Sequence, residues 1–571
     1  MERTPLTAET VAATGACRTA STRHTALARL LPVLALTLLL ASCRRESEYF
    51  GKTDPPEENV FRFNNGAEPE YLDPGMMTAN TDERIAAMLF EGLTQKDPRT
   101  LQPMPGIAER WEIAPDGLTY TFFLRRGAQW SDGHTVTAHD FVYAWTRVLD
   151  PKTASAFASI LYPILNAEQF NQGKLKDRSQ VGVEALDNYT LRVRLQDPVP
   201  YFLYLTTFFT LYPVPSWIVE KHGADWTRPE HVVGNGAFRL IEHRINDRIV
   251  LEKNPRYYNA AQVRLDRVIA YAVVDLYTAI NLYESGEVDW MPSNSVPSDF
   301  VPHMQGRFRD YSSTPQLASY YFTINTTHPP FDNRLVRRAL ALAIDRRAIT
   351  DELLRGGQIP GSNFVPVGLP GYQSPPGPDY NPQEAARLLA EAGYPGGKGF
   401  PEMELSFNTL ETHKRIAEAM QQMWEKNLGI RIRLHNEEWA SFIKTRQNKE
   451  HDIARQGWIA DYPDPAAFLD LMESTNGNND TGWKNAKYDA LMTASRKETD
   501  PFRRIELLQQ AESIVLDELP VLPLYSYSVN TLLKPYVKGI YPTSLDMHPL
   551  NEVCIDRRWR ERGDSPDGHC E

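Results

Sequence analysis

The sequence contains none of the short motifs that would assign catalytic or cofactor chemistry. It has no HExxH, CxxC or GxSxG and no P-loop ending in GKS or GKT, and Gly234 and Gly236 lack the third glycine of a dinucleotide fingerprint. The 13 His residues do not have the spacing of metal ligands, and the oxygen-rich segment 476–480 (NGNND) lacks the final Glu of a calcium loop, which predicts a polar turn. We therefore expect a protein that is not an enzyme and has no metal or cofactor.

The chemistry that the N-terminal segment favours is lipid attachment. The apolar run 30–41 (LLPVLALTLLLA) follows several Arg residues and is shorter than the roughly 20 residues that span a membrane, which predicts a signal peptide over residues 1–42. Its end, LASC, resembles a bacterial lipobox. That resemblance implies transfer of diacylglycerol to the Cys43 thiol and cleavage before Cys43; an ordinary cleavage site is the alternative. Residues 1 to about 17 precede a normal n-region, so a start codon further along the chain is an alternative to Met1.

The charge balance argues against a nucleic acid partner. The chain has 61 Lys and Arg against 73 Asp and Glu, and removal of residues 1–42, with four Arg and two Glu, takes the net charge from −12 to −14. An acidic chain is repelled by a phosphate backbone. The polar segment 43–59 is expected to be a tether between membrane and body. Cys554 and Cys570 either pair in an oxidising compartment or remain two free thiols.

The elements that must position functional residues belong to a mixed α and β body. With 571 residues, of which 42% are hydrophobic and 23% charged, the chain has room for three or four folded domains. The sequence predicts helices after the capping box at Thr137, from Asn381 to Gly393, and up to Gly429. It also predicts a strand over 430–435 and a strand over 452–457, the second delivering residues 458–461 into a loop.

Several segments, in order along the chain, resemble the extracytoplasmic solute-binding proteins of peptide ABC importers, the large oligopeptide- and dipeptide-binding family 5. The resemblance extends from about residue 60 to residue 540. The segments that carry it are 72–74 (LDP), 89–93 (LFEGL), 124–133 (LRRGAQWSDG), 137–145 (TAHDFVYAW), 234–238 (GNGAF), 320–325 (YYFTIN), 329–337 (PPFDNRLVR) and 457–462 (GWIADY).

This resemblance implies a two-lobed α/β periplasmic-binding-protein fold, type II-like, with an extra inserted domain and a hinge between the lobes. The expected parts are lobe 1 at 60–90, 215–317 and 530–571, the inserted domain at 91–214, and lobe 2 at 318–529. Closure of the lobes would enclose an oligopeptide. The expected protein is a monomer, exported and anchored through Cys43 on the periplasmic or outer side of a membrane. It would deliver its ligand to an ABC permease and ATPase complex.

A receptor for peptides of many sequences must bind what all peptides share, namely an ammonium group, a carboxylate and the amide backbone. The resemblance implies that Asp461 pairs with the peptide's α-ammonium, since a carboxylate in a closed cleft is a strong acceptor for N–H donors. His413, at a helix start that favours anions, and Arg455 match basic positions for the carboxylate. Arg446 matches a further basic position that lines the cleft.

The remaining site residues shape the pockets. Trp439 and Trp458 match aromatic walls of the side-chain pockets, and Asn294 and Tyr321 match polar positions beside the backbone and pockets. Phe157 stands at a cleft position where the family has Tyr, so a hydroxyl is lost. If the peptide adds to the sheet as a further strand, its backbone hydrogen bonds would give affinity that does not depend on its side chains.

Two further departures affect side-chain preference. Gln316 stands where a Tyr is known, and Ala318 and Ile459 occupy two places that hold paired cysteines in some members. A neighbouring hypothesis is another solute on the same fold, such as a dipeptide, murein peptide, metal complex or sugar. Alternatives of other classes are a secreted lipid-anchored hydrolase, whose carboxylate pair no short motif would reveal, and an adhesive or signalling lipoprotein. The retention of Asp461 together with His413 and Arg455 favours peptides.

Overall fold

A mixed sheet of 11 strands is the largest element within the described residues of this computed structural model, which are 48–292, 295–568 and 570. Residues 49–571 belong to one compact unit. The strands follow the order β15 (Ile432–Glu437), β14 (Met403–Asn408), β16 (Ile453–Ile459), β12 (Tyr311–Ile324), β17 (Val521–Leu533), β11 (Trp290–Met291), β1 (Val60–Asn64), β10 (Arg267–Tyr271), β9 (Arg248–Lys253) and β8 (Phe238–Arg244), with β13 (Ile359–Pro360) also paired to β17.

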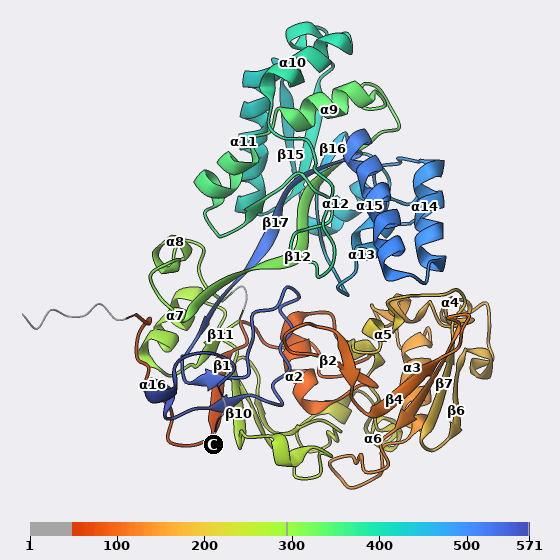
Figure 1. Ribbon diagram of the computed structural model, residues 1–571, viewed down its shortest axis with the longest axis vertical. Coiled ribbons are helices and arrows are strands. Elements are labelled where there is room, and N and C mark those ends of the chain that lie inside the picture. The colour runs from red at the N-terminus through yellow and green to blue at the C-terminus, as the bar shows by residue number, and fades with distance from the viewer. Residues whose placement is uncertain (1–47, 293–294, 569, 571) are drawn as a thin grey trace, which may run out of the picture. The chain divides into compact units, whose positions relative to one another are not determined.

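Two long strands, β12 and β17, run through both halves of this sheet (Figure 1). They pair antiparallel from Tyr311 opposite Leu532 to Thr323 opposite Val521, with an irregularity between Pro315 and Ser319. A proline and a register shift weaken the ladder locally, since a proline has no N–H to donate. The expected lobe boundaries at 317/318 and 529/530 both fall within these strands.

The buried side chains form separate cores in the two halves of the sheet that β12 and β17 connect. One cluster joins Phe61 and Trp290 to Trp145 and Trp559, so the expected lobe 1 and the expected inserted domain share a core. Further clusters lie mainly in the expected lobe 2, one around Trp424 and one with members between Phe468 and Leu516 that also includes Leu101 and Leu545. A smaller cluster lies under α7 (Leu276–Ser285) and α8 (Val301–Met304).

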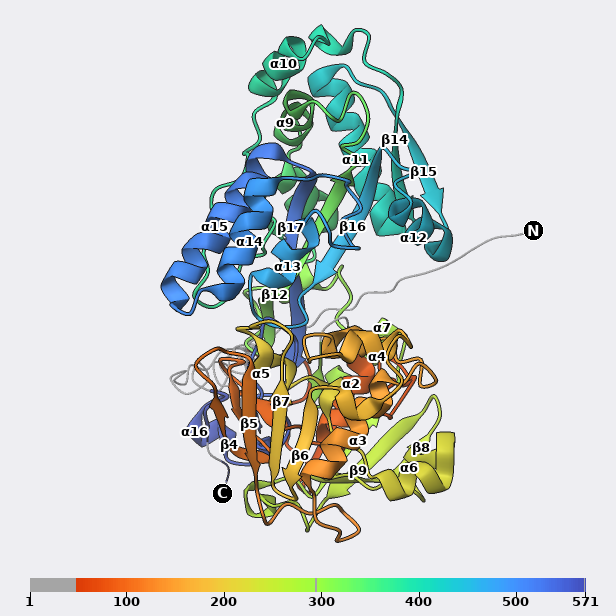
Figure 2. The same ribbon diagram turned by 90° about the vertical axis from the view of Figure 1, so that its right-hand side faces the viewer.

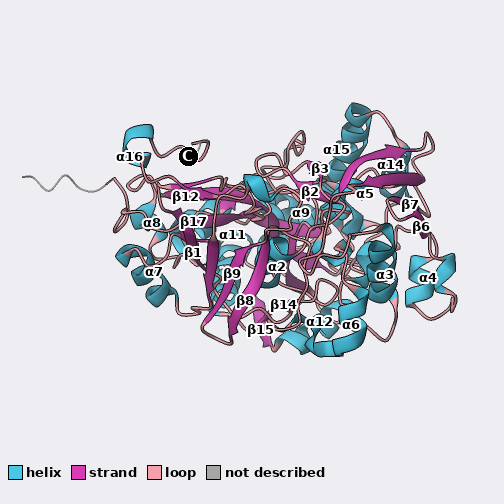
Figure 3. Ribbon diagram, turned by 90° about the horizontal axis from the view of Figure 1, so that it is seen from below, coloured by secondary structure: helices cyan, strands magenta, loops and turns pink. Residues whose placement is uncertain are grey.

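A separate antiparallel sheet lies in the segment expected as the inserted domain (Figures 2 and 3). Its order is β4 (Ala108–Ile113), β5 (Thr119–Leu124), β7 (Thr190–Arg194) and β6 (Val183–Asp187). Helix α3 (Ala138–Leu149) packs beside β6. The predicted capping box at its start is present: the Thr137 side chain and Asp140 satisfy each other's backbone N–H groups, and Phe141 and Trp145 are buried.

The remaining helices and strands surround these two sheets. The other helices are α2 (Asn80–Leu89), α4 (Ala167–Asn171), α5 (Phe202–Leu205), α6 (Ser216–His222), α9 (Arg334–Leu342), α10 (Pro382–Glu391), α11 (Glu411–Leu428), α12 (Trp439–Gln447), α13 (Ala466–Leu469), α14 (Ala486–Lys497), α15 (Pro501–Glu518) and α16 (Trp559–Arg562). Two small hairpins pair β2 (Thr94–Lys96) with β3 (Pro103–Pro105) and β18 (Val537–Lys538) with β19 (Cys554–Ile555).

Helix and strand boundaries near the predicted site agree with the sequence in part. Helix α11 ends, as predicted, at Gly429, whose φ of 69° is the left-handed conformation that glycine adopts without strain. The predicted end of the strand at Gly457 is wrong. Strand β16 continues to Ile459, because pairing with β12 extends to Ala318 opposite Ile459. Trp458 and Ile459 therefore belong to the strand, and only the next residues form the loop.

The segment expected as a tether between membrane and body is docked to the body over part of its length. Tyr49 packs edge-on against Trp559, with ring centroids 5.3 Å apart, and the backbone N–H of Phe50 donates to Asp310 at 2.9 Å. Because these aromatic side chains pack on the body, the segment follows the surface of the body from Tyr49 onward, although most of its residues are polar. The predicted signal peptide and Cys43 lie outside the described residues. Near the other end, Cys554 and Cys570 are joined as a disulfide.

Two searches of the described residues gave no candidates. No helix there has both the length and the apolar character needed to cross a membrane. No group of three or more His, Cys, Asp or Glu side chains there could hold a metal ion.

Candidate functional site

An unpaired backbone edge runs along the second half of β16. Within the described residues, β14 pairs with β16 only at Ile453 and Ala454, whereas β12 pairs with β16 as far as Ile459. Ala460 N–H donates to the carbonyl of Leu317 at 2.8 Å. Because alternate residues of an antiparallel strand point their N–H and C=O groups to opposite sides, the backbone groups of 457 and 459 point to the unpaired side. This edge can accept another extended chain.

At the start of this edge, Arg455 is held by aromatic side chains. Its guanidinium carbon lies 4.8 Å from the centre of the Tyr320 ring, and its Nη2 donates to the Tyr527 hydroxyl at 3.1 Å. A Cβ on Gly457 would lie only 3.3 Å from Nη2, so the guanidinium folds back beside Gly457. Its buried Nε has no hydrogen-bond partner, and no carboxylate pairs with it among the described residues. Arg455 is therefore a cation without a counter-ion in this part of the chain.

His413 lies in the first turn of α11, as predicted, but its charge differs from the expectation. Nδ1 is 3.0 Å from the Tyr320 hydroxyl, and the side chain is buried. Burial, and then the nearby Arg455 charge, lowers the pKa of His413 to about 3. The imidazole is neutral at pH 7, so it supports the Tyr320 ring beneath Arg455 rather than adding a second positive charge.

Arg446 lies on α12 beside the same edge and has a counter-ion. Its Nη1 donates to the carbonyl of Arg455 at 3.5 Å, and its Nε lies 2.9 Å from Oδ2 of Asp480. The neighbouring Tyr321 is fully buried on β12, and its hydroxyl has no hydrogen-bond partner among the described residues. Burial raises the pKa of Tyr321, so the hydroxyl stays neutral and can donate.

Asp461 lies beyond the far end of β16, two residues past Ile459. Its carboxylate is partly buried and makes no hydrogen bond or ion pair with another residue in the described ranges. Burial raises the pKa of Asp461 to about 6. The next residue, Tyr462, stacks on Tyr201, with ring centroids 4.1 Å apart and planes 9° apart. Asp461 is thus a desolvated anion that lacks a cation, fixed beside a contact with the segment expected as the inserted domain.

The two predicted tryptophans differ in their surroundings. Trp439 at the start of α12 is 51% exposed, which is unusual for such a large apolar side chain and suits a wall of a binding site. Trp458 packs against the cluster that contains Tyr321, and its Nε1 is buried without a hydrogen-bond partner. Ile459, the next residue, is 56% exposed. Apolar surface is therefore available on the strand next to the unpaired edge.

Two of the predicted ligand-binding residues are not placed beside the β16 edge by the structure. Phe157 lies in the segment expected as the inserted domain and packs against Phe208 and Phe209, with centroids 5.5 and 5.8 Å away. Asn294 lies outside the described residues. The other seven predicted ligand-binding residues lie on α11, α12, β12, β16 and the loop after β16.

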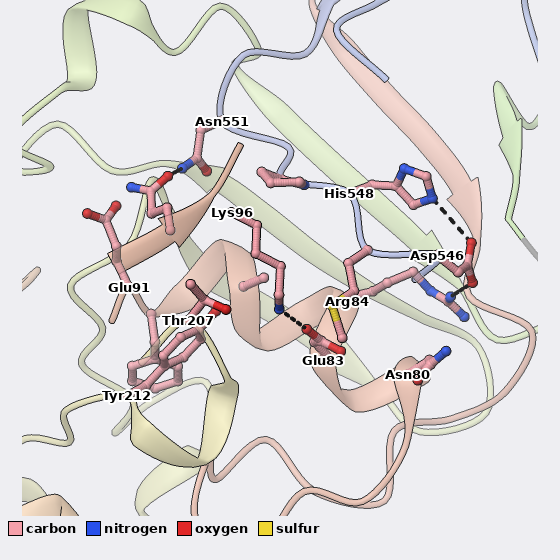
Figure 4. A pocket seen from close by; sticks show the side chains of 15 residues that line it. Asn80, Glu83, Arg84, Glu91, Lys96, Thr207, Tyr212, Asp546, His548 and Asn551 are labelled. Carbon is pink, nitrogen blue, oxygen red and sulfur yellow. Dashed lines mark hydrogen bonds and ion pairs between the residues drawn. The ribbon is translucent and has the colours of Figure 1, made fainter. Parts of the chain in front are cut away.

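A different pocket is lined by α2, β2 and the segment 546–551 (Figure 4). Four of its charged side chains form pairs, Lys96 with Glu83 at 3.5 Å and Arg84 with Asp546 at 3.6 Å, while Glu91 accepts hydrogen bonds from the Tyr257 and Tyr258 hydroxyls. None of the predicted ligand-binding residues lines it. Because both of its ion pairs are already formed and Glu91 is hydrogen-bonded to two tyrosines, this pocket does not offer the acid and base without partners that lie along the β16 edge.

Three residues important to the site were not predicted. Tyr320 and Tyr527 hold Arg455, and Asp480 neutralises Arg446. The sequence signals were weak: Tyr320 adjoins the predicted Tyr321, and Asp480 ends the segment interpreted as a polar turn. Nothing in the sequence near Asp480 indicates a partner on α12.

A two-lobed α/β body crossed by two strands, with a desolvated acid and an uncompensated base along one strand edge, is the arrangement expected of a solute-binding protein. Comparison with known proteins agrees. Residues 102–480 match the family described as bacterial extracellular solute-binding proteins, family 5 Middle, and the chain belongs to this family of binding receptors, which are not enzymes. The family and fold inferred from the sequence are thereby confirmed.

Relatives match over most of their lengths. The chain is 39% identical over 527 residues to the periplasmic oligopeptide-binding protein OppA of Salmonella typhimurium, covering 91% of this chain and 95% of that protein. The structure of MppA, a periplasmic murein tripeptide binding protein, in an unliganded open form matches with a TM-score of 0.78, 34% identity and coverage of 88% and 98%. Haemophilus influenzae OppA in complex with the peptide RPPGFSPFR matches with a TM-score of 0.71, 35% identity and coverage of 88% and 99%.

Proposed function

We propose that this protein is an exported, lipid-anchored receptor that binds oligopeptides and delivers them to an ABC importer. In this proposal the peptide lies between the two lobes, with its α-ammonium on Asp461 and its carboxylate on Arg455. The permease and ATPase complex of the importer is the partner that receives the peptide. Anchoring through Cys43 keeps the receptor beside that complex.

The observation that carries the proposal is the uncompensated carboxylate of Asp461 at the end of an unpaired strand edge. A desolvated carboxylate is unfavourable unless a cation pairs with it. An arriving ammonium group supplies that cation, while the outward N–H and C=O groups of 457 and 459 supply backbone hydrogen bonds. Neither interaction depends on the peptide's side chains, which is what a receptor for varied sequences requires.

The spacing of the two charges predicts a short ligand. The Arg455 guanidinium lies beside Gly457, which is four positions from Asp461. At about 3.3 Å per residue of fully extended chain, and with residues 460–461 in the loop after β16, these positions are at most about 13 Å apart, no longer than a peptide of about four residues. The peptide would run antiparallel to β16, since its amino end lies at Asp461, after the strand.

The ligands named for the relatives support the proposal that this protein binds peptides. One binds oligopeptides, one is named for murein tripeptide, and one was solved with a nonapeptide. Titration calorimetry with tri- to pentapeptides tests the proposal directly, with a murein tripeptide and a free sugar as competing ligands. Micromolar or tighter binding of unmodified peptides supports it, and failure to bind any peptide contradicts it.

Peptide affinity is expected to depend on pH through Asp461. The pKa of Asp461 is raised to about 6, and pairing with an ammonium group lowers it, so protonation competes with the peptide. Affinity should rise with pH up to about 6, remain level, and fall again as the peptide's amino group loses its proton near about pH 8. At pH 5 the dissociation constant should be about tenfold larger than at pH 7.

Calorimetry across pH 4.5–9 checks this expectation. The pKa of Asp470 is also raised to about 6 by burial, so the Asp461→Asn variant is the control that assigns the titration. That variant should lose the acid limb of the profile. An unchanged acid limb in the variant would assign the titration to another group.

Membrane attachment is expected to depend on the Cys43 thiol. The exchange Cys43→Ser removes the group that would carry the acyl chains, and with them the apolar area that holds the protein on a membrane. The variant should move from the membrane fraction to the soluble fraction of lysed cells, as followed by immunoblotting. Its peptide affinity should match that of the parent protein. Retention of the variant in the membrane fraction would show that Cys43 is not the anchor.

A further inference from the structure

The segment between the proposed lipid anchor and the fold is bound to the body where its described part begins. The ring of Phe50 packs against Tyr283 and Phe308, with ring centroids 6.3 and 5.4 Å away. The backbone N–H of Phe50 donates to Asp310 at 2.9 Å, and its carbonyl accepts a hydrogen bond from Nζ of Lys534 at 3.0 Å. Phe50 is therefore held through both its side chain and its backbone.

The next two residues follow the end of α7 closely. The backbone N–H of Lys52 donates to the carbonyl of Glu284 at 2.9 Å. Gly51 has a φ of 72°, and a Cβ on it would lie only 2.4 Å from the same carbonyl oxygen. Glycine adopts this left-handed conformation without strain and has no Cβ to meet the carbonyl, so Gly51 determines the path of the segment at this point.

The C-terminal tail contacts the same segment through two arginines. Arg560 on α16 pairs with Asp54 at 3.0 Å, and Nη2 of Arg557 donates to the carbonyl of Glu57 at 2.6 Å. In Figure 1 the start of the described chain, at the red end of the colour range, runs beside α16. The segment is thus bound by the body up to residue 52 and by the tail after it.

The tail is itself closed by the disulfide between Cys554 and Cys570, which encloses α16. Asp564, inside the same closed loop, accepts a hydrogen bond from the Tyr49 hydroxyl at 3.0 Å and pairs with Arg309 at 2.7 Å. A cross-link reduces the number of conformations open to the chain that it encloses. The disulfide therefore favours the conformation in which the tail contacts the segment.

We propose that the disulfide-closed tail fastens residues 49–59 to the body, so that the surface around α16 and the end of α7 lies against the membrane. This inference rests on the proposed anchoring through Cys43. With the segment fastened, only the six residues 43–48 separate the anchor from the fold, and they reach at most about 21 Å. Without fastening, the 17 residues 43–59 reach at most about 60 Å. Fastening thus decides whether lobe 1 stays beside the membrane or moves well away from it.

Hydrogen–deuterium exchange on the purified protein, followed by mass spectrometry, tests the fastening. Backbone amides of residues 49–59 should exchange at least about tenfold more slowly in the parent protein than in the double variant Cys554→Ser with Cys570→Ser, because loss of the cross-link frees the tail. Thermal unfolding shows whether each variant is folded. This measurement does not depend on lipid attachment or on peptide binding.

A second variant keeps the disulfide and removes the contacts of the tail. Arg557→Gln with Arg560→Gln should raise the exchange of the segment at least about tenfold. The matched control is Arg387→Gln with Arg431→Gln, which removes two exposed arginines from surface ion pairs elsewhere and should leave the exchange unchanged. Exchange that is the same in the parent and in both folded tail variants overturns the proposal.

Energy transfer from a dye on the receptor to acceptor lipids tests the position against the membrane, with the acylated protein bound to vesicles. Ser285→Cys places the dye at the exposed end of α7, and Arg431→Cys places it just before β15 in the expected lobe 2. Transfer from residue 285 should be at least about twofold greater, since the anchor reaches only about 21 Å from the fold. The difference should disappear when Cys554 and Cys570 are replaced.

The outcomes of the two experiments separate the steps of the inference. Equal transfer from the two dye positions in the parent protein overturns the position of α16 and the end of α7 against the membrane. Failure of the parent protein to attach to vesicles overturns the anchoring through Cys43 and that position with it. In either case the exchange measurement still decides whether the tail fastens the segment, and calorimetry with peptides still decides the receptor function.

Discussion

Exchange of Asp461 for Asn is expected to weaken binding of a short peptide with a free amino terminus by roughly 30- to 5,000-fold. The reason is that truncating one partner of a desolvated charge pair costs about 2–5 kcal/mol. Asn keeps the size of the side chain and can still accept one hydrogen bond, so the change isolates the charge. Calorimetry at pH 7 is the measurement, because Asp461, with a pKa of about 6, is mostly ionised there.

The control is a peptide whose amino group is acetylated. The parent protein should bind the acetylated peptide at least about tenfold more weakly than the free peptide, whereas the Asn variant should bind the two with similar affinity. The four measurements form a cycle that separates the charge pair from any general disturbance of the loop. Equal binding of free and acetylated peptides by the parent protein would remove Asp461 from the proposed role.

Exchange of Arg455 for Gln is expected to have the second large effect. The guanidinium is held by Tyr320 and Tyr527 and has no acid partner among the described residues, so its positive charge is available to a ligand. Its removal should weaken binding of a tetrapeptide acid by roughly 30-fold or more and abolish the difference between acid and amide. Arg455→Lys should recover only part of the affinity, because an ammonium group lacks the planar fork of a guanidinium.

The matched control for net charge is Arg431→Gln. The side chain of Arg431 is 88% exposed and its ion pair with Glu425 is a surface contact. Surface pairs contribute little to stability, so this variant should fold and bind as the parent does. If both Gln variants weaken binding to the same degree, the effect comes from the overall charge of the protein rather than from contact with the carboxylate.

The position at which β16 ends determines how far the hydrogen-bonding edge extends from Arg455 toward Asp461. If the strand ended at Gly457, as the sequence predicted, the backbone of residue 459 would lie in the loop and could not extend the hydrogen-bonding edge. Pairing of Ala318 with Ile459 extends this edge by two residues beyond Gly457. The loop that contains Asp461 therefore begins only after Ile459. The same pairing places these two residues directly opposite each other, as the family resemblance, which puts paired cysteines at these positions in some members, led us to expect.

Several local features were predictable because neighbouring residues determine them. The capping box of α3 and the glycine that ends α11 depend only on residues within one or two turns of a helix. The family segments identified the fold, and the sequence placed Asp461 after a strand and His413 at a helix start. Each of these statements needs side-chain chemistry and spacing, but no knowledge of distant contacts.

The sequence by itself therefore determined the family, the fold class and which residue types could clamp the ends of a peptide. Only the tertiary structure decided which of those charges is available. Asp480 meets Arg446, Tyr527 meets Arg455, and burial makes His413 neutral through contacts between residues far apart in the chain. Such contacts depend on strand register and packing, and desolvation depends on everything that surrounds a group, so no local pattern of residues encodes them.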